Sequence, residues 1–448
     1  MRSIRTCCFP VLLFLIPLCT CAQRAKYFTL PGKPGKEEIR IAGKLGNKIH
    51  LWSMPLQFYQ DHLHETTLSL HILTADLILA DEKKIVLGKS FVRNLDFQFA
   101  DSVYYAHLFY NSGINKRMLL KIDRNGNVDD VTNMPSSWKS HAVPKDGQGL
   151  GFISRNSSSL FVIKTETGVA EDSLDTNELV ILPGEKVQAG GIYKKLILRK
   201  ANRINGQVME QQSFASSLLD FSKLIISAND SAVLACAFAQ PAADAGRHNP
   251  YNGNYLFISR LDTNLAAQAG GTVLLKLAGG KKNEYYAPES MYTAGKNQLI
   301  ISKGRILKQY YSYGGRNNGG FTPPAVYNYY ITSSLRLTLV DERNRFLLDT
   351  IIESRGGRES LELDNYFVSA RNDGADIFCI HQYSASKNGI THFSIGKDGQ
   401  IDEKEMMVNE DYLYGLGGAY PLENSALLIP YHYRRTNGIM KLQYAPAE

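Results

Sequence analysis

The chain lacks the short motifs of the common enzyme classes and has very little tryptophan. No G-x-S-x-G, H-E-x-x-H or G-x-x-x-x-G-K sequence occurs, so the usual signatures of serine hydrolases, zinc proteases and P-loop proteins are absent. Only Trp52 and Trp138 are found among the 448 residues. Long helical periodicity is missing too, which leaves short strands and turns as the basis of the fold.

Cysteine is scarce once the start of the chain is set aside. Residues 9–18 are an apolar run behind Arg2 and Arg5, too short to span a bilayer, and Thr20-Cys21-Ala22 fits a cleavage site. We predict a signal peptide over 1–22 and an exported protein, periplasmic or extracellular, with a lipid anchor at Cys21 as the alternative.

Only Cys236 and Cys379 remain outside this leader. They lie in repeats that are not neighbours, so we expect two buried thiols and no disulfide.

No excess of one charge marks a nucleic-acid-binding surface. Without Arg2 and Arg5 the chain holds 48 basic and 43 acidic side chains, and the two signs are interspersed. A net charge of +5 is mild for this size, which argues against nucleic acid as a partner. Outside the leader no apolar run approaches ~18 residues, so we expect no transmembrane segment.

One pattern returns eight times: an apolar alternating strand, a tight polar turn and a second apolar strand. The turns lie near Gly46, Asp101, Asp146, Gly190, Asp230, Lys296, Asp373 and Asn424. Their mean spacing is 54 residues, which is typical of a β-propeller with roughly four strands per blade. The paired glycines of kelch blades do not recur in register, and the Trp-Asp steps of WD40 blades and the S-x-D-x-G-x-x-W boxes of propeller sialidases are absent.

The two ends of the chain predict how the ring closes. The last repeat supplies three strands, at 418–422, 426–433 and 439–444, and then ends. A strand-like piece at 26–30 is left over at the other end and is the natural fourth strand. We therefore predict a single all-β domain over 23–448 with eight four-stranded blades, or seven if the first or fourth unit is incomplete.

Two long spacings locate insertions at 240–254 and 309–328, between the second and third strands of their blades. Both are rich in Tyr, Arg, Asn, Gly and Pro. In propellers these loops share a face with the connections between blades, so the insertions and the ends of other second strands are expected to form one rim. A rim of this kind suits a glycan, a peptide or a protein partner, although exposed irregular loops have the same composition. The candidate ligand-binding residues are Arg247, His248, Tyr251, Tyr310, Tyr311, Tyr313, Arg316, His381, Tyr383, His432 and Arg434.

A second set of polar residues precedes the inner strands and supports an alternative function. Two carboxylates at the mouth of the central channel could serve a carbohydrate-active hydrolase or lyase. Their offsets from the turns vary, however, and such residues often bind backbone amides instead. The set comprises Asp96, Asp220, Glu289, Asp364 and Asp411.

No metal or cofactor site is predicted. His62 and His64 alternate as two ligands on a strand would, but no third ligand is identified. The 123–129 segment has its glycine in the wrong place for an EF-hand and is interpreted as a β-turn.

The hairpin repeat, the leader ending in Ala22-Gln23 and the outer turns IDRNGNV and IGKDGQID resemble those of secreted bacterial β-propeller proteins of uncharacterised function. The resemblance implies architecture and transfers no catalytic residue. The leading hypothesis is a non-enzymatic propeller that binds a partner on its loop face. A hydrolase or lyase and a structural component of the cell envelope are the alternatives.

Overall fold

The computed structural model shows an all-β chain. Apart from one 3-10 turn, η4 (Leu416–Gly418), every regular element in the described residues is a strand. The described residues are 25–30, 37–55, 63–100, 103–131, 152–155, 160–164, 177–183, 186–188, 192–202, 208–220, 225–228, 233–241, 255–262, 265–277, 285–312, 316–317, 320–321, 325–354, 360–384, 387–434 and 436–444, with only the backbone described between 152 and 232.

Two sheets in the second half of the chain have the predicted four-stranded meander. In each, the strands are antiparallel and follow chain order. The first contains β19 (Tyr285–Ala294), β20 (Asn297–Ser312), β23 (Ala325–Val340) and β24 (Phe346–Glu353), and the second contains β25 (Ser360–Arg371), β26 (Gly374–Ser384), β27 (Lys387–Gly396) and β28 (Ile401–Met406). Their alternating apolar positions pack against each other in one core that includes Leu337 and Ile377.

The first two units form one seven-stranded sheet, whereas separate blades were predicted. The sheet contains β2 (Glu37–Leu45), β3 (Lys48–Pro55), β4 (His64–Thr74), β5 (Leu79–Ala100), β6 (Val103–Asn111), β7 (Asn115–Asp123) and β8 (Val128–Asp130). The 22-residue β5 joins the units, because its first half pairs with β4 and its second half with β6. A register shift between Val92 and Asn94 lies close to the point where the partner of β5 changes from β4 to β6. A β-bulge there bends the strand, so that one strand can belong to two units.

The middle of the chain forms a ten-stranded sheet. Its strands are β9 (Phe152–Arg155), β10 (Leu160–Lys164), β11 (Asn177–Pro183), β12 (Lys186–Gln188), β13 (Ile192–Asn202), β14 (Val208–Asp220), β15 (Ile225–Ala228), β16 (Val233–Pro241), β17 (Tyr255–Leu261) and β18 (Ala267–Lys276). A short pairing of β14 with β16 joins strands β9 to β14 to strands β15 to β18. β10 pairs with β11 in parallel. This irregularity falls where the sequence repeat is weakest.

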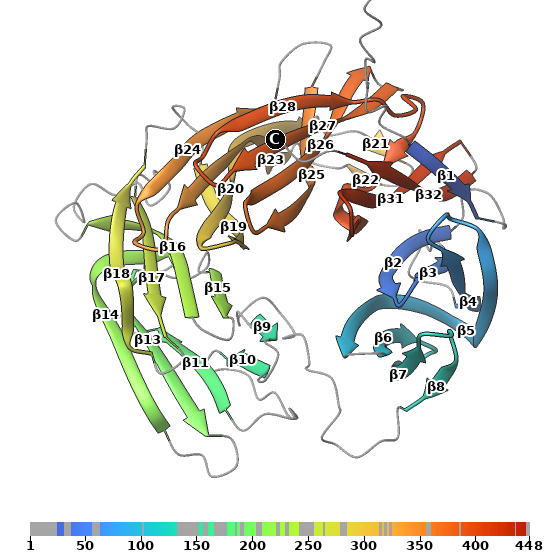
Figure 1. Ribbon diagram of the computed structural model, residues 1–448, viewed down its shortest axis with the longest axis horizontal. Helices are drawn as coiled ribbons and strands as arrows, with labels where there is room; N and C mark the ends of the chain where they lie inside the picture. Colours follow the sequence, from blue (N-terminus) through green and yellow to red (C-terminus); the bar gives the residue numbers. More distant parts are fainter. Residues whose placement is uncertain are drawn as a thin grey trace, which may run out of the picture.

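The N-terminal strand joins the last sheet. β1 (Ala25–Thr29) pairs antiparallel with β32 (Thr436–Gln443), followed by β31 (Ala426–Tyr433), with β29 (Leu413–Tyr414) and β30 (Tyr420–Leu422) both on β31. The predicted pairing of the two chain ends is therefore observed. Figure 1 shows the sheets following one another in chain order around a common centre, as blades do in a propeller.

The inner hairpins agree with the sequence repeat. Antiparallel partners flank the predicted turns at Gly46, Asp101, Gly190, Asp230, Lys296, Asp373 and Asn424. The turn predicted near Asp146 lies outside the described residues.

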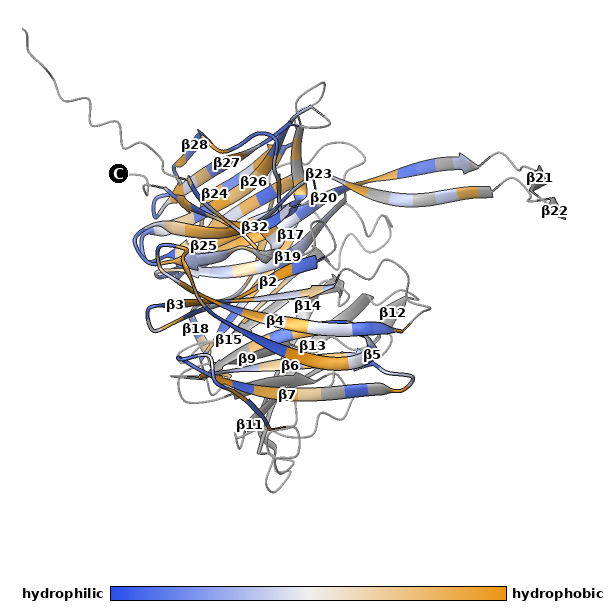
Figure 2. Ribbon diagram, turned by 90° about the vertical axis from the view of Figure 1, so that its right-hand side faces the viewer, coloured by the Kyte–Doolittle hydropathy of each residue, from blue (hydrophilic) through white to orange (hydrophobic). Residues whose placement is uncertain are grey.

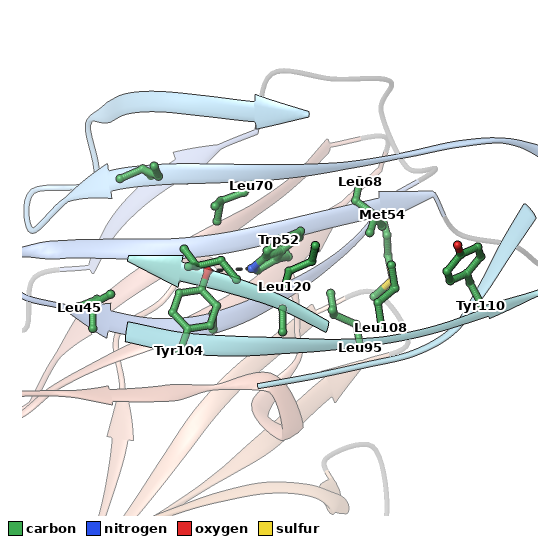
Figure 3. Packing of buried hydrophobic residues seen from close by; sticks show 14 residues of the cluster. Leu45, Trp52, Met54, Leu68, Leu70, Leu95, Tyr104, Leu108, Tyr110 and Leu120 are labelled. Atoms are coloured by element: carbon green, nitrogen blue, oxygen red, sulfur yellow. Dashed lines mark hydrogen bonds between the residues drawn. The ribbon is translucent and has the colours of Figure 1, made fainter. Parts of the chain in front are cut away.

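The core of the first two units is built around a hydrogen-bonded aromatic pair. Trp52 and Tyr104 are fully buried, and the Trp52 indole Nε1 donates to the Tyr104 hydroxyl oxygen at 3.0 Å. Figure 3 shows the pair between leucines of several strands. Because each polar group satisfies the other, two large rings are buried without an orphaned donor.

The two remaining cysteines are free and buried, as predicted. Burial raises the pKa of the Cys379 thiol to about 12. Both therefore act as small apolar side chains.

A second repeated feature lies at the outer edge of the sheets. In five turns the N–H of the first residue donates to the carbonyl oxygen four residues on. The fourth residue of each has positive φ. These fourth residues are Leu77, Gly126, Leu265, Asn344 and Gly399. The turns connect the third and fourth strands of their units.

Replacing Gly399 by alanine is expected to cost more stability than the same change at Gly46. Both have positive φ, +87° and +64°, which costs an L-residue about 1–2 kcal/mol. A Cβ at Gly399 would in addition lie 2.4 Å from the Leu347 carbonyl oxygen of the neighbouring sheet, whereas Gly46 has free space. We expect roughly 1 kcal/mol for Gly46→Ala and about 2–4 kcal/mol for Gly399→Ala in urea unfolding. Equal losses would contradict the tight contact between the sheets.

Candidate functional site

The most distinctive feature of the surface is a two-stranded arm. β20 and β23 stay paired as far as Ser312 and Ala325, but β19 reaches only Arg305 on β20 and β24 only Ser334 on β23. Residues 306–312 and 325–331 therefore pair only with each other, and we call them the arm. Figure 2 shows it extending beyond the rest of the molecule. The insertion predicted as a loop over 309–328 is thus largely strand, because its Tyr and Val residues favour extended backbone.

Both faces of the arm expose apolar and aromatic side chains. One face carries Leu307, Tyr311 and Val326, and the other carries Tyr327, Tyr329 and Ile331, as the register requires. These residues are 37–58% exposed. The Tyr311 hydroxyl donates to the Gln309 Oε1 at 3.1 Å. Exposed tyrosines on a narrow ribbon offer flat apolar surfaces with polar tips.

A buried ammonium fixes the root of the arm. Lys303 of β20 has a side chain only 9% exposed, and its Nζ lies 2.8 Å from the Glu289 Oε1 and 3.5 Å from the Asp364 Oδ1. The Thr332 hydroxyl donates to the same Asp364 oxygen. These contacts tie both arm strands to β19 and β25, so the arm leaves the molecule from a fixed base.

A second ion pair lies behind the root. The buried Arg336 donates from Nε and Nη2 to the two oxygens of Asp349, at 2.7 and 2.5 Å. Its guanidinium also lies 5.7 Å from the centre of the Tyr286 ring. This bidentate ion pair fixes β23 to its neighbour β24 in the sheet that carries the arm.

The carboxylates predicted as a catalytic set are brought together only in part. Glu289 and Asp364 meet at Lys303, and their oxygens can be no further apart than the sum of their distances to its nitrogen. Asp96 accepts a bond from the Asn94 side chain, and the backbone N–H of Asp411 donates to the Asn409 side chain. The side chain of Asp220 lies outside the described part.

Two predicted binding residues lie at the end of β26, the strand equivalent to β20. His381 is 4% exposed, and its ring lies 4.5 Å from that of Tyr383. Its Nδ1 lies 3.6 Å from the Glu405 Oε1. Tyr383 lies over Gly389, where an added Cβ would meet the hydroxyl at 2.5 Å. Packing therefore involves most of the His381 surface and leaves Tyr383 the more accessible of the two.

Two other predicted binding residues, His432 and Arg434, lie at the end of β31. The His432 Nδ1 lies 2.5 Å from the Asn437 Oδ1, and Asn437 donates to the Glu37 backbone oxygen. The exposed Arg434 has a φ of 51°, and its guanidinium lies 5.0 Å from the centre of the Tyr433 ring. This end of the last sheet therefore presents a cation on an aromatic surface.

Tyr433 also belongs to a tyrosine cluster, which was not identified from the sequence. It comprises Tyr27, Tyr412, Tyr414, Tyr431 and Tyr433. Tyr412 stacks on Tyr431 at 4.6 Å, and Tyr27 of β1 meets both rings edge-on. Burial, and then the hydrogen bond with Tyr27, raises the pKa of the Tyr414 hydroxyl. The cluster joins the two ends of the chain, so its first role is structural.

The other predicted binding residues cannot be placed as side chains. Arg247, His248, Tyr251 and Tyr313 lie outside the described residues, while Tyr310 and Arg316 are described by backbone alone, in β20 and β21 (Arg316–Asn317, paired with β22, Gly320–Phe321). His62 also lies outside them, and His64 is exposed. Among the described residues no three His, Cys, Asp or Glu side chains group as metal ligands, and no helix there is long and apolar enough to cross a membrane.

Comparison with known proteins adds no family. No protein-family model matches the chain, and no curated protein is similar in sequence. Solved structures with some likeness include a Trypanosoma rangeli sialidase with 2,3-difluorosialic acid, at 7% identity and a TM-score of 0.31 over 94% of this chain and 59% of that one. Drosophila Semaphorin 1a, extracellular domains 1–2, matches at 9% and 0.31 over 93% and 88%. A post-proline cleaving enzyme from Rickettsia typhi matches at 9% and 0.33 over 89% and 57%.

These likenesses are too distant to say anything about chemistry. The chain spans about three fifths of the length of the sialidase. The candidate site therefore depends on the arm and its surroundings alone.

Proposed function

We propose that the protein is a non-enzymatic binding protein with an eight-bladed, closed propeller as scaffold and the arm as its binding element. The observation that supports this most is the exposure of six apolar or aromatic side chains on a ribbon with a rigid root. Such a ribbon contributes nothing to the core. A rooted aromatic surface binds at lower entropic cost, because strand pairing already restricts its backbone.

The positive charge of the arm favours an acidic ligand. The segment 304–334 contains Arg305, Lys308 and Arg316 and no Asp or Glu. Exposed tyrosines beside cations suit a chain of rings that carries carboxylate or sulfate groups, so we propose an extended acidic glycan as ligand. The predicted leader would export the protein to a compartment where such polymers occur.

The hydrolase alternative has less support. A glycosidic bond must lie between the two carboxylates that cleave it. The Lys303 nitrogen contacts both Glu289 and Asp364, so one oxygen of each carboxylate is engaged in an ion pair. We therefore assign these residues to the root of the arm.

Excising the arm tests the proposal. A variant in which Asn-Gly joins Ile306 directly to Ile331 keeps every pairing of β19 and β24, since these two residues are partners in the register. We expect its unfolding midpoint to stay within a few degrees while affinity for an acidic polysaccharide such as alginate falls at least tenfold. Binding would be measured by calorimetry on the mature chain, with neutral dextran as a control.

Two results would contradict the proposal. Unchanged alginate affinity after excision would remove the arm from the binding site. Turnover of a glycan that is lost in both Glu289→Gln and Asp364→Asn would establish catalysis at the root instead.

A further inference from the structure

The two edges of the arm differ in how they are protected from pairing. Exposed edge strands usually carry charges, prolines or bulges that prevent another strand from adding to the sheet. The β20 edge carries Lys308, next to Arg305 at the root. The β23 edge over 325–331 reads Ala-Val-Tyr-Asn-Tyr-Tyr-Ile and contains no charge, proline or glycine. We call the β20 edge, which carries charge, the guarded edge and the uncharged β23 edge the open edge.

An isolated two-stranded ribbon is only marginally stable in water. In the described residues no third strand and no facing sheet covers 306–312 and 325–331. Most residues of the open edge, namely Val326, Tyr327, Tyr329, Tyr330 and Ile331, have high β propensity and would gain from another strand. The structure therefore provides a sheet that lacks its next strand on the β23 side.

We propose that this strand is β23 of a second copy of the chain, paired antiparallel across a two-fold axis at Asn328. Such an interface is self-complementary, so one open edge suffices for both partners. The axis places Tyr327 of one copy opposite Tyr329 of the other, twice. Cross-strand aromatic pairs of this kind stabilise antiparallel sheets. The result is a four-stranded ribbon with one arm from each copy.

The charges of the arm do not oppose this pairing. The strand order is β20 and β23 of one copy, followed by β23 and β20 of the other, which keeps the two Lys308 residues three strand spacings apart. That distance is about 14 Å, longer than the ~8 Å over which charges act at physiological salt. The same cations on a pairing of β20 with β20 would be adjacent, which favours the β23 edge.

The dimer is tested on the mature chain without any ligand, so its outcome does not depend on the proposed glycan. We expect light scattering coupled to gel filtration to give a dimer at tens of micromolar and a monomer for Tyr329→Lys. Leu307→Lys is the matched control on the guarded strand, because Leu307 and Tyr329 are 46% and 49% exposed. Its dimer should persist. A monomeric wild type, or a Tyr329→Lys protein that stays dimeric, would overturn the proposal.

A cross-link checks the register independently. Asn328→Cys places two thiols on the two-fold axis, and mild oxidation should give a covalent dimer in most of the protein. Cys236 and Cys379 are buried, so the wild type should give none. Failure to cross-link in a protein that is still dimeric would mean that another surface holds the copies together and would also overturn the proposal.

Discussion

A chain that lacks residues 1–30 is expected to lose its cooperative fold. β1 supplies five register partners to β32, and without it β32 becomes an exposed edge. Five backbone pairings at about 1 kcal/mol each, together with the lost aromatic contacts of Tyr27, approach the whole stability of an ordinary domain. We expect soluble aggregates and no sharp thermal transition, measured by light scattering and circular dichroism.

The matched control begins at residue 23 and should unfold cooperatively, because it keeps β1. Two point variants separate aromatic packing from strand pairing. Tyr27→Ala removes contacts with Tyr412 and Tyr431 and should cost about 2–4 kcal/mol, whereas Lys26→Ala removes only an exposed ion pair with Asp76. A truncated chain that melts like the control would show that the pairing of the two ends is dispensable.

The inner hairpins could be predicted because their signal is local. A tight turn needs polar or glycine residues at fixed positions, and the flanking strands alternate over a few residues. The boundaries of the last repeat were within about two residues for β30 and β31, and the N-terminal strand was found from the missing fourth partner. Both inferences use only neighbours in the sequence and one rule about unpaired edges.

The positive φ of the outer turns was predicted only where glycine marks it. Glycine at positions 126 and 399 indicates positive φ, and both turns were predicted from the sequence. Leu77 and Leu265 adopt the same backbone with a residue that rarely does so, and only their position in the structure reveals them. The shared feature is the hydrogen-bond pattern, which no residue type encodes.

The insertion that forms the arm was located from the sequence, but its structure was predicted wrongly. The long spacing between repeats correctly marked 309–328 as additional chain, and irregular composition made it look like a loop. Tyr311, Val326 and Tyr327 are strand residues instead, because β20 and β23 continue past their neighbours. Spacing alone cannot reveal that two strands extend a ribbon. The root was equally hidden, since nothing in the sequence joins Lys303 to Asp364.

Stability is expected to fall on acidification because of His50. Its ring is fully buried and packs edge-on against Tyr104, and among the described residues neither ring nitrogen has a hydrogen-bond partner. Burial, and then the nearby Lys48, lowers the pKa of His50 to about 4, while Asp123 acts in the opposite direction. Burial lowers the pKa of His71 on the adjacent strand as well.

The sign follows from linkage between proton binding and folding. A histidine whose folded pKa is below its unfolded value of about 6.5 binds protons preferentially when unfolded. Its contribution is fully retained above pH 6.5 and is lost progressively as the pH falls toward 4. For His50 the loss has a ceiling of about 3 kcal/mol. Urea unfolding of the mature chain at several values between pH 7.5 and 4.5 measures it.

Carboxylates also titrate near the lower end of this range, so the decisive quantity is the difference between variants. His50→Leu fills the site without a titrating group and leaves no buried nitrogen unpaired, so its stability should fall by about 1–3 kcal/mol less than that of the wild type between pH 6.5 and 4.5. His64→Gln, on an exposed residue of β4, should leave the profile unchanged. Parallel profiles for the wild type and His50→Leu would mean that His50 is protonated in the folded protein, with an acceptor supplied by a rearranged neighbour.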